Sequence, residues 1–476
     1  MKSGYKIFLI TVGLISIISL PLTVFGESWE KVTEIQRRKW NEQYDKKGLY
    51  KQTGMAIDKS SKFIQVPKGM NPDWLVGVEI AQTPPEIEFA PVRGIDPMYF
   101  PEDNKSLWSN WAGVTRAPNG RFYFAEGDHR AAGSSLYMWE YDPGASNYSR
   151  VLDFAHLCGW DKRGVGDSKI HGDMGVMPDG TLWILTYWDP DPKPTEEQYA
   201  LWPGSHLIRY DTYTGRAQDM GIPMPKAGWP YYRLDPERGY FFAVGFRGEI
   251  LNYNVRENRV TYAGYPPEGI KWGLRCTMLD PETGLFWTAN QEKPHNFISF
   301  DPQTATFTAY EETTPNDLGR NVGNNSLMRA HSHKRSKGGF FWVNSQNGTL
   351  YKFWPETRRT EVVTHLWIDQ TYVPRIAMSE DENYIYYVPN LVQTYSYYQP
   401  VMQFNTETYT RKVIAFIADY YFDKYGFYNG GAHGLAISQD GGTLVINFNG
   451  AFKPRIPPFY GNPALMVVRI PESERE

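Results

Sequence analysis

The sequence predicts an all-β fold, a seven-bladed β-propeller with four-stranded antiparallel blades. The first observation is a motif that returns seven times: a short strand, a tight polar turn and a second, more apolar strand. Two copies read "HGDMGVMPDGTLWILTYWD" from His171 and "HGLAISQDGGTLVINFN" from His433. The turn markers of the seven copies are Gly120, Gly180, Gly239, Gly284, Gly339, Asn383 and Gly441.

The second observation is that further strand-turn-strand runs, such as "HLIRYDTYTGRAQDM" and "NFISFDPQTATFTAY", lie between these copies and complete each blade. The third is that helical periodicity is largely absent, apart from residues 28–48. After Gly441 too few strand-like runs remain to finish the last blade. The segment "PEIEFAPV", residues 85–92, is therefore predicted to supply its outer strand and close the ring.

The chain divides into a signal peptide (1–26), an N-terminal helix and closing-strand segment (27–95) and the propeller (96–476). Two lysines precede an apolar run over residues 7–24, and small residues follow it, which is typical of a secretory signal. A retained membrane anchor is the alternative. We expect a secreted or periplasmic protein without stable membrane insertion.

The composition limits the classes of binding partner that we expect. A net charge of -4 gives no basic field for nucleic acid, so nucleic-acid binding is not expected. The two cysteines, Cys158 and Cys276, allow one disulfide at most. Aromatic residues make up 16% of the chain, which suits β-strands and clefts that contact sugar rings. We expect a monomer.

In a propeller, the first strand of each blade starts, and the second ends, on the same face. The first-strand starts carry Asn110 or Trp111, His171, Tyr231 or Tyr232, Arg275, Arg329 with His331, Arg375 and His433. The second-strand ends carry His129, Trp188 and Arg247. Since the chain has only 9 histidines, this gathering of histidine and arginine predicts a functional site for an anionic ligand, bound by guanidinium forks.

An aromatic-flanked cationic cleft on an exported propeller suits an acidic polysaccharide as substrate. β-Elimination at a uronate needs a group that neutralises the carboxylate, a base for the C5 proton and an acid for the leaving oxygen. Arginine or histidine can do the first, and tyrosine or histidine the second and third. A glycosidase carboxylate pair is not favoured, because this face is basic and aromatic.

The segments "SNWAGVTRAPNGRFYFAEGDH", "SKIHGDMGVMPDGTLWILTYW" and "YYRLDPERGYFFAVGFRGEIL" resemble the propeller-type ulvan lyases, which cut a sulfated rhamnose–uronate polysaccharide. The resemblance implies that Tyr231 acts as base and acid, that Arg247 helps to neutralise the carboxylate, and that His171 and His129 complete the site. Tyr232 remains a rival to Tyr231. The residues predicted to bind substrate are Tyr232, Trp188, Arg275, Arg329, Arg375, His433 and Asn110.

The resemblance also implies a structural metal near the axis. Cys276, His295, His331 and His333 fall in adjacent blades and offer ligand types that suit Zn²⁺. An unligated Cys276 beside ordinary polar histidines is the alternative. Acidic segments at 189–192 and 311–317 could bind Ca²⁺, but solvated loops are the favoured interpretation there.

Two other functions remain open at this point. One is a metal-dependent lyase on another uronate, such as oligogalacturonate, in which histidines hold a catalytic metal. The other is a non-catalytic propeller that binds anionic glycans or a protein partner.

Overall fold

The structure is a computed structural model. It describes residues 56–91, 109–129, 135–190, 193–316, 318, 327–368, 372–390, 399–451 and 463–476. The signal segment (1–26) and the helix expected over 28–48 lie outside the described residues.

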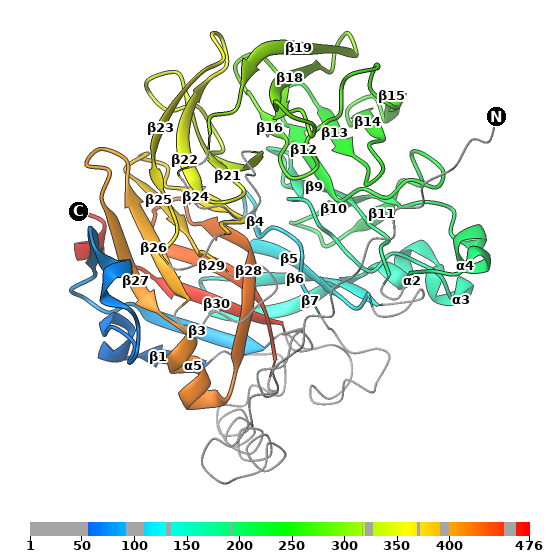
Figure 1. The fold of residues 1–476 in the computed structure, drawn as a ribbon. Coiled ribbons are helices and arrows are strands. Elements are labelled where there is room, and N and C mark those ends of the chain that lie inside the picture. The colour runs from blue at the N-terminus through cyan, green and yellow to red at the C-terminus, as the bar shows by residue number, and fades with distance from the viewer. Residues whose placement is uncertain are drawn as a thin grey trace, which may run out of the picture.

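Seven sheets stand around a common axis, which confirms the predicted seven-bladed propeller (Figure 1). Within blades 1 to 5 the strands follow one another outward in chain order. Blade 1 contains β4 (Thr115–Arg116), β5 (Phe122–Gly127), β6 (Leu136–Asp142) and β7 (Asn147–Asp153). Blade 2 contains β8 (Gly175–Val176), β9 (Thr181–Leu185), β10 (Leu207–Asp211) and β11 (Ala217–Asp219). Blade 3 contains β12 (Tyr231–Asp235), β13 (Tyr240–Val244), β14 (Ile250–Asn254) and β15 (Arg259–Gly264).

The remaining blades keep this plan, with additions from the N-terminal part of the chain. Blade 4 contains β16 (Met278–Leu279), β17 (Phe286–Ala289), β18 (Asn296–Asp301) and β19 (Thr306–Thr313). Blade 5 contains β20 (Met328–His331), β21 (Phe341–Ser345), β22 (Thr349–Trp354) and β23 (Arg359–His365). Blade 6 contains β24 (Ile376–Met378), β25 (Tyr384–Tyr387), β26 (Pro400–Asn405) and β27 (Arg411–Phe416), and blade 7 contains β28 (Tyr428–Ile437), β29 (Thr443–Ala451) and β30 (Ala464–Arg469).

Short helices lie at the ends of the strands and between blades. The α-helices are α2 (Phe154–Cys158), α3 (Trp160–Arg163), α4 (Glu196–Leu201) and α5 (Ala418–Tyr425), and the 3₁₀ helices are η2 (Ser61–Ile64), η3 (Pro72–Leu75) and η4 (Glu472–Glu474). Among the described residues no helix is both long and apolar enough to cross a membrane.

The turn between the first two strands is the repeated unit that the sequence identified. In six blades the predicted turn glycine has a positive φ, between 70° at Gly441 and 84° at Gly180. Blade 6 differs, because the left-handed residue is Glu382 (φ 68°) and not the predicted marker, Asn383. A non-glycine residue tolerates this conformation only at a steric cost.

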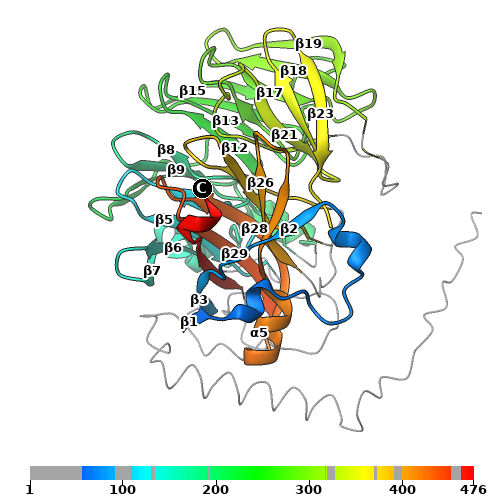
Figure 2. The ribbon, with the colours of Figure 1, turned by 90° about the vertical axis from the view of Figure 1, so that its left-hand side faces the viewer.

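The ring closes because strands from both ends of the chain share blade 7. The predicted closing strand is confirmed as β3 (Glu86–Pro91), which pairs antiparallel with β30. Two strands were not predicted: β1 (Ala56–Lys59) pairs with β3, and β2 (Val78–Ile80) pairs parallel with β27. Both are too short to show a strand pattern in the sequence. Figure 2 shows the blue N-terminal strands beside the red and orange C-terminal ones.

Substitution of Phe89 in the closing strand tests how much ring closure contributes to stability. Phe89 is fully buried, and its ring lies 4.4 Å from that of Tyr421, 5.6 Å from Tyr425 and 5.1 Å from Phe427. We expect Phe89→Ala to lower the free energy of unfolding by about 3–5 kcal/mol, measured by urea denaturation. Ile57→Ala on β1, where the side chain is 48% exposed, should cost less than about 1 kcal/mol. Equal losses would contradict a closing role for β3.

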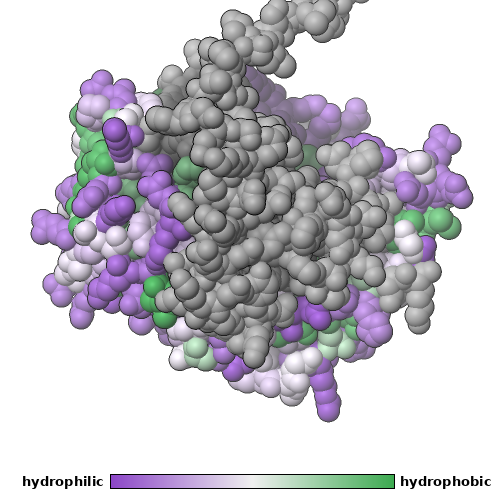
Figure 3. Space-filling model, turned by 90° about the horizontal axis from the view of Figure 1, so that it is seen from below, coloured by the Kyte–Doolittle hydropathy of each residue, from purple (hydrophilic) through white to green (hydrophobic). Residues whose placement is uncertain are grey.

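The core lies between neighbouring blades rather than in one central cluster. Between blades 3 and 4, for example, Phe242 packs against Trp272 (4.7 Å between ring centroids), Phe286 (5.0 Å) and Phe300 (4.9 Å). Packing of this kind accounts for much of the aromatic content. Seen from below, the described surface is mostly hydrophilic with scattered apolar residues (Figure 3).

Candidate functional site

Seven side chains, one from each blade, gather around the axis on the face where the first strands begin. We call this group the mouth; it consists of Trp111, His171, Tyr231, Arg275, Arg329, Arg375 and His433. The Trp111 ring lies 5.8 Å from His171 and 4.7 Å from His433, and the His171 ring lies 5.0 Å from Tyr231. The structure therefore brings these residues together, with Trp111 and not Asn110 at the blade 1 position.

Irregular pairing at the first strands directs two of these side chains into the mouth. On β20, Met328 pairs with Ser345 and Ala330 with Asn344, so Arg329 is the extra residue of a β-bulge. On β28, Ala432 pairs with Phe448 and Gly434 with Asn447, so His433 is likewise the extra residue. Bulges re-aim side chains in this way, and they are frequent next to active sites.

Tyr231 and Arg275 form a pair that joins blades 3 and 4. Arg275 Nη1 donates a hydrogen bond to Tyr231 Oη (2.9 Å). Interaction with Tyr231 is the largest cause of a raised Arg275 pKa, so the guanidinium remains charged. Because the Tyr231 oxygen accepts this bond, its own hydrogen is left for another partner in the mouth.

Arg329 and Tyr372 form a second pair of the same kind. Both Nε and Nη2 of Arg329 donate to Tyr372 Oη (3.0 and 2.5 Å), and Nη1 donates to the Arg275 carbonyl oxygen (3.2 Å). Within the described parts of the chain, neither Arg275 nor Arg329 has a carboxylate within 4.0 Å. Two guanidiniums so placed can bind a carboxylate or sulfate group through paired hydrogen bonds.

The histidines of the mouth are neutral at physiological pH. Burial, followed by the charge of Arg275, lowers the pKa of His171 well below its ordinary value. Burial, followed by the charge of Arg329, lowers the pKa of His433 to about 3. His171 Nδ1 is buried without a hydrogen-bond partner in the described structure. A neutral imidazole can accept a hydrogen bond from a ligand there.

Acid should destabilise the fold through the low pKa of His433. The unfolded chain binds a proton at His433 near pH 6.5, whereas the folded protein does so only near pH 3. The free energy of unfolding should therefore fall as the pH drops from about 6.5 to about 3, by up to about 1.4 kcal/mol per pH unit. We expect His433→Asn to flatten this pH dependence, measured by urea denaturation at each pH. His156→Asn, at an exposed position, should leave the pH dependence unchanged. An unaltered slope in His433→Asn would contradict the low pKa of the His433 imidazole.

Below the mouth, the carboxylate of Asp173 links arginines from two blades across the axis. Asp173 accepts from Arg233 Nη2 (3.0 Å) and Arg375 Nη2 (2.9 Å), from blades 3 and 6. Burial alone would raise the Asp173 pKa, but Arg375 and Arg233 outweigh it and hold the pKa below its ordinary value. The surrounding cavity of about 350 Å³ is lined by residues of all seven blades.

Sequence reasoning missed three of these residues. Asp173 and Arg233 each follow a predicted mouth residue by two positions, so the period of two along a strand could have indicated them. Tyr372 precedes the blade 6 copy of the motif, and no pattern in the sequence relates it to Arg329.

Arg247 does not lie beside Tyr231, although the sequence resemblance assigned both to one site. Its guanidinium bonds Glu249 (2.7 Å), the Tyr199 hydroxyl (3.0 Å) and the Lys226 carbonyl oxygen (2.5 Å), on the loop after β13. Arg275 occupies the position next to Tyr231 that had been expected for Arg247.

Two other predicted substrate contacts, Trp188 and Asn110, are placed away from the mouth, whereas Tyr232 lines the cavity below it. Trp188 is 7% exposed and packs on Trp202, with 4.7 Å between the ring centroids. Asn110 is fully buried, where its main chain bonds the Asn449 side chain. Tyr232 is 3% exposed and packs on Phe241.

His129 lies at the edge of the mouth. Its ring is 6.0 Å from that of Trp111, and its Nδ1 is 3.0 Å from the Ser109 hydroxyl. It is therefore close to the site but separated from Tyr231 by Trp111 and His171.

The four residues predicted to hold a metal near the axis do not form a ligand group. Cys276 lines the cavity, and His331 contacts Arg233 (3.2 Å). His295 bonds the Asn290 carbonyl oxygen (2.9 Å). His333 pairs with Glu380 (3.6 Å) beyond the ends of β20 and β24, on the opposite face, because it follows a strand instead of beginning one.

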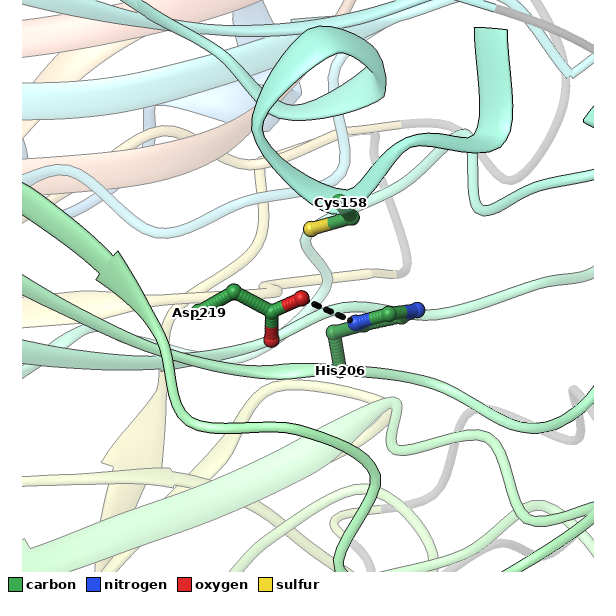
Figure 4. A group of neighbouring side chains, drawn as sticks. All are labelled: Cys158, His206 and Asp219. Atoms are coloured by element: carbon green, nitrogen blue, oxygen red, sulfur yellow. Dashed lines mark hydrogen bonds and ion pairs between the residues drawn. The ribbon is translucent and has the colours of Figure 1, made fainter. Parts of the chain in front are cut away.

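One other group does bring metal-ligand atoms together. The ligand atoms of Cys158, His206 and Asp219 all lie within 4.8 Å of one another, and no other such group of three occurs among the described residues (Figure 4). The group lies where α2 packs against the outer strands of blade 2. The two acidic segments considered for Ca²⁺ are described only in part, and Asp189 in the first of them pairs with Lys169 (3.1 Å) and Lys193 (2.6 Å).

Comparison with known proteins identifies no family. No family model matches the sequence, and no curated protein matches it. One similar solved structure is described as the crystal structure of RRP9 WD40 repeats, with 10% identity, a TM-score of 0.48, and coverage of 80% of this chain and 97% of that one. Another is described as the structure of U3-55K, with 8% identity, a TM-score of 0.46, and coverage of 80% and 98%.

Proposed function

We propose that this protein is a secreted polysaccharide lyase that cleaves a uronic-acid-containing polysaccharide by β-elimination at the mouth. The observation that carries the proposal is the arrangement of two guanidiniums, Arg275 and Arg329, without carboxylate partners beside the Tyr231 hydroxyl and neutral imidazoles. This arrangement supplies the three functions that the reaction requires.

The uronate carboxylate is assigned to Arg275 and Arg329. The two arginines come from neighbouring blades, and Arg329 Nη1 donates to the backbone carbonyl oxygen of Arg275 (3.2 Å). Charge-assisted bonds to the carboxylate stabilise the enolate-like charge that develops when C5 loses its proton. Arg375 is less available for this role, because Asp173 holds it at 2.9 Å.

Tyr231 is assigned both proton transfers. The hydroxyl first loses its own proton to solvent; the resulting oxygen, as base, takes the C5 proton, and the electrons of the C5–H bond form the C4–C5 double bond. The C4–O bond breaks, and the leaving oxygen receives the proton from the same hydroxyl. No oxidant, reductant or water is consumed. Arg275 stabilises the charged tyrosine oxygen through its hydrogen bond.

His171 and Trp111 are assigned to orient the sugar. The two rings stack with an interplanar angle of 4°, and a small rotation of the His171 ring would turn its enclosed, unpartnered Nδ1 toward a sugar hydroxyl. A neutral imidazole accepts such a bond, whereas a protonated one would compete with the arginines for the carboxylate.

Ulvan is the leading substrate within this proposal. The sequence resemblance favours it, and a cluster of guanidiniums suits a polymer that carries sulfate as well as carboxylate. Export through the N-terminal signal segment would bring the protein to such a polysaccharide.

The test is incubation with ulvan, pectic oligogalacturonates and glycosaminoglycans, monitored by the ultraviolet absorbance of unsaturated uronates. We expect the absorbance to rise with ulvan. A rise with oligogalacturonate alone, abolished by a chelator, would support the metal-dependent lyase instead. Binding to these polymers without any rise would support a non-catalytic glycan-binding propeller.

A further inference from the structure

We propose that Cys158, His206 and Asp219 bind a zinc-class divalent cation on the outer edge of blade 2. The three come from separate elements: Cys158 ends α2, His206 precedes β10 and Asp219 ends β11. Figure 4 shows the side chains converging, with Asp219 bonded to His206. This place differs from the axial site that the sequence resemblance implies, and the proposal does not depend on the proposed lyase activity.

The ligand types are those of a borderline-soft metal. Thiolate sulfur, imidazole nitrogen and carboxylate oxygen together are characteristic of Zn²⁺, whereas Ca²⁺ and Mg²⁺ prefer oxygen alone. The three atoms already lie within 4.8 Å, so small side-chain movements would bring them to bonding distance. Water would complete a tetrahedral site, since no fourth protein ligand belongs to the group in the described residues.

Charge balance supports a divalent cation. On binding, Cys158 releases its thiol proton to solvent, the ring proton of His206 moves from Nδ1 to Nε2, and Nδ1 exchanges its Asp219 partner (2.9 Å) for the metal. Thiolate and carboxylate then neutralise the two charges of the ion. Arg163 is the nearby cation, and its Nε is held by the Val165 carbonyl oxygen (3.1 Å).

The imidazole is held in place by a buried network behind it. His206 is 6% exposed, and its backbone N–H donates to Thr186 Oγ1 (2.9 Å). Asp167, which is fully buried, accepts from Thr186 Oγ1 and from Trp202 Nε1 (3.0 Å), and it interacts electrostatically with His206. Such outer contacts orient metal-ligating histidines. His206 Nε2 is buried without a hydrogen-bond partner in the described residues, so the ring is ordered through its backbone N–H and through Nδ1.

A bound metal would restrain the segment that connects blades 1 and 2. α2 packs on β11, and the chain continues from Cys158 through α3 to His171 in the mouth. Linking α2 to the two outer strands of blade 2 would restrain this connecting segment. The proposed role is therefore stability of the propeller rather than a step in catalysis.

The test uses Co²⁺ in place of Zn²⁺, because a Co²⁺–thiolate bond gives a near-ultraviolet charge-transfer band. The chain has only two cysteines, so Cys158→Ser and Cys276→Ser form a matched pair. We expect the band in the wild type and in Cys276→Ser, and its loss in Cys158→Ser. A band that disappears with Cys276→Ser and persists in Cys158→Ser, or no band in the wild type, would overturn the proposal.

Affinity and stability give a second readout. Titration with Zn²⁺ should show one site per chain, and His206→Ala should weaken binding by about tenfold or more. Zn²⁺ should raise the Tm of the wild type and of Cys276→Ser but not of Cys158→Ser. The same Tm change in both cysteine variants would contradict the assignment. Lyase activity is not needed for any of these measurements, so failure here leaves the proposed function untouched.

Discussion

Tyr231→Phe is expected to lower kcat on the preferred polysaccharide by about 10²–10⁴-fold while KM changes little. The substitution removes one oxygen, the atom assigned to both proton transfers. The ring remains, so its contact with His171 at 5.0 Å is kept and the fold should not change. Initial rates from the unsaturated-uronate absorbance measure the effect, and unfolding curves check that stability is preserved.

Tyr232→Phe is the matched control. It removes the same atom from the neighbouring residue, whose ring packs on Phe241 within the fold. We expect nearly wild-type kcat. The reverse result, an active Tyr231→Phe and an inactive Tyr232→Phe, would move the base to Tyr232, and two active variants would move it to His171.

Arg275→Ala is expected to lower kcat/KM by about 10²–10³-fold, because it removes a donor to the developing carboxylate charge. It also removes the hydrogen bond to Tyr231 Oη, so kcat should fall as well as binding weaken. The measurement is steady-state kinetics on the polysaccharide that gives the largest absorbance change.

Arg247→Ala separates the site seen in the structure from the one that the sequence resemblance implies. Arg247 is exposed and bonded to Tyr199 and Lys226, so its loss should leave kcat/KM within a few-fold of the wild type. A large loss with Arg247→Ala and a small one with Arg275→Ala would restore the assignment from the resemblance.

The architecture was predictable because each blade repeats local chemistry. Positive φ at the turn requires glycine at positions such as Gly120 and Gly180, and this marks each hairpin in the sequence. The missing outer strand of the last blade then pointed to Ile87 and Phe89 in the closing strand. β1 and β2 could not be found, because three or four residues show no periodicity.

The site was predictable to the level of blade positions but not of contacts. A register rule places His171, Tyr231 and Arg275 at strand starts, and the structure brings these three together. The register rule cannot show that Arg275 of blade 4, rather than Arg247 of blade 3, bonds Tyr231. Nor can it show a bulge such as that at Arg329, which depends on how two strands pair.

The metal ligands illustrate the same limit. His333 was expected near the axis together with His331. It follows the end of the four-residue strand β20, however, and therefore lies on the opposite face of the propeller. Cys158, His206 and Asp219 are far apart in the chain and follow no metal-binding spacing. Only the packing of α2 against β11 brings them together.

The most direct test of the proposed lyase activity is cleavage of ulvan in heavy-oxygen water, with the products analysed by mass spectrometry. Elimination at the mouth predicts unsaturated uronates at the new non-reducing ends, and no heavy oxygen at the new reducing ends when these are reduced with borohydride before they exchange with water. Saturated ends that carry the label would show hydrolysis and contradict the assignment of Tyr231, Arg275 and Arg329 to elimination. The absence of any cleavage would contradict it equally.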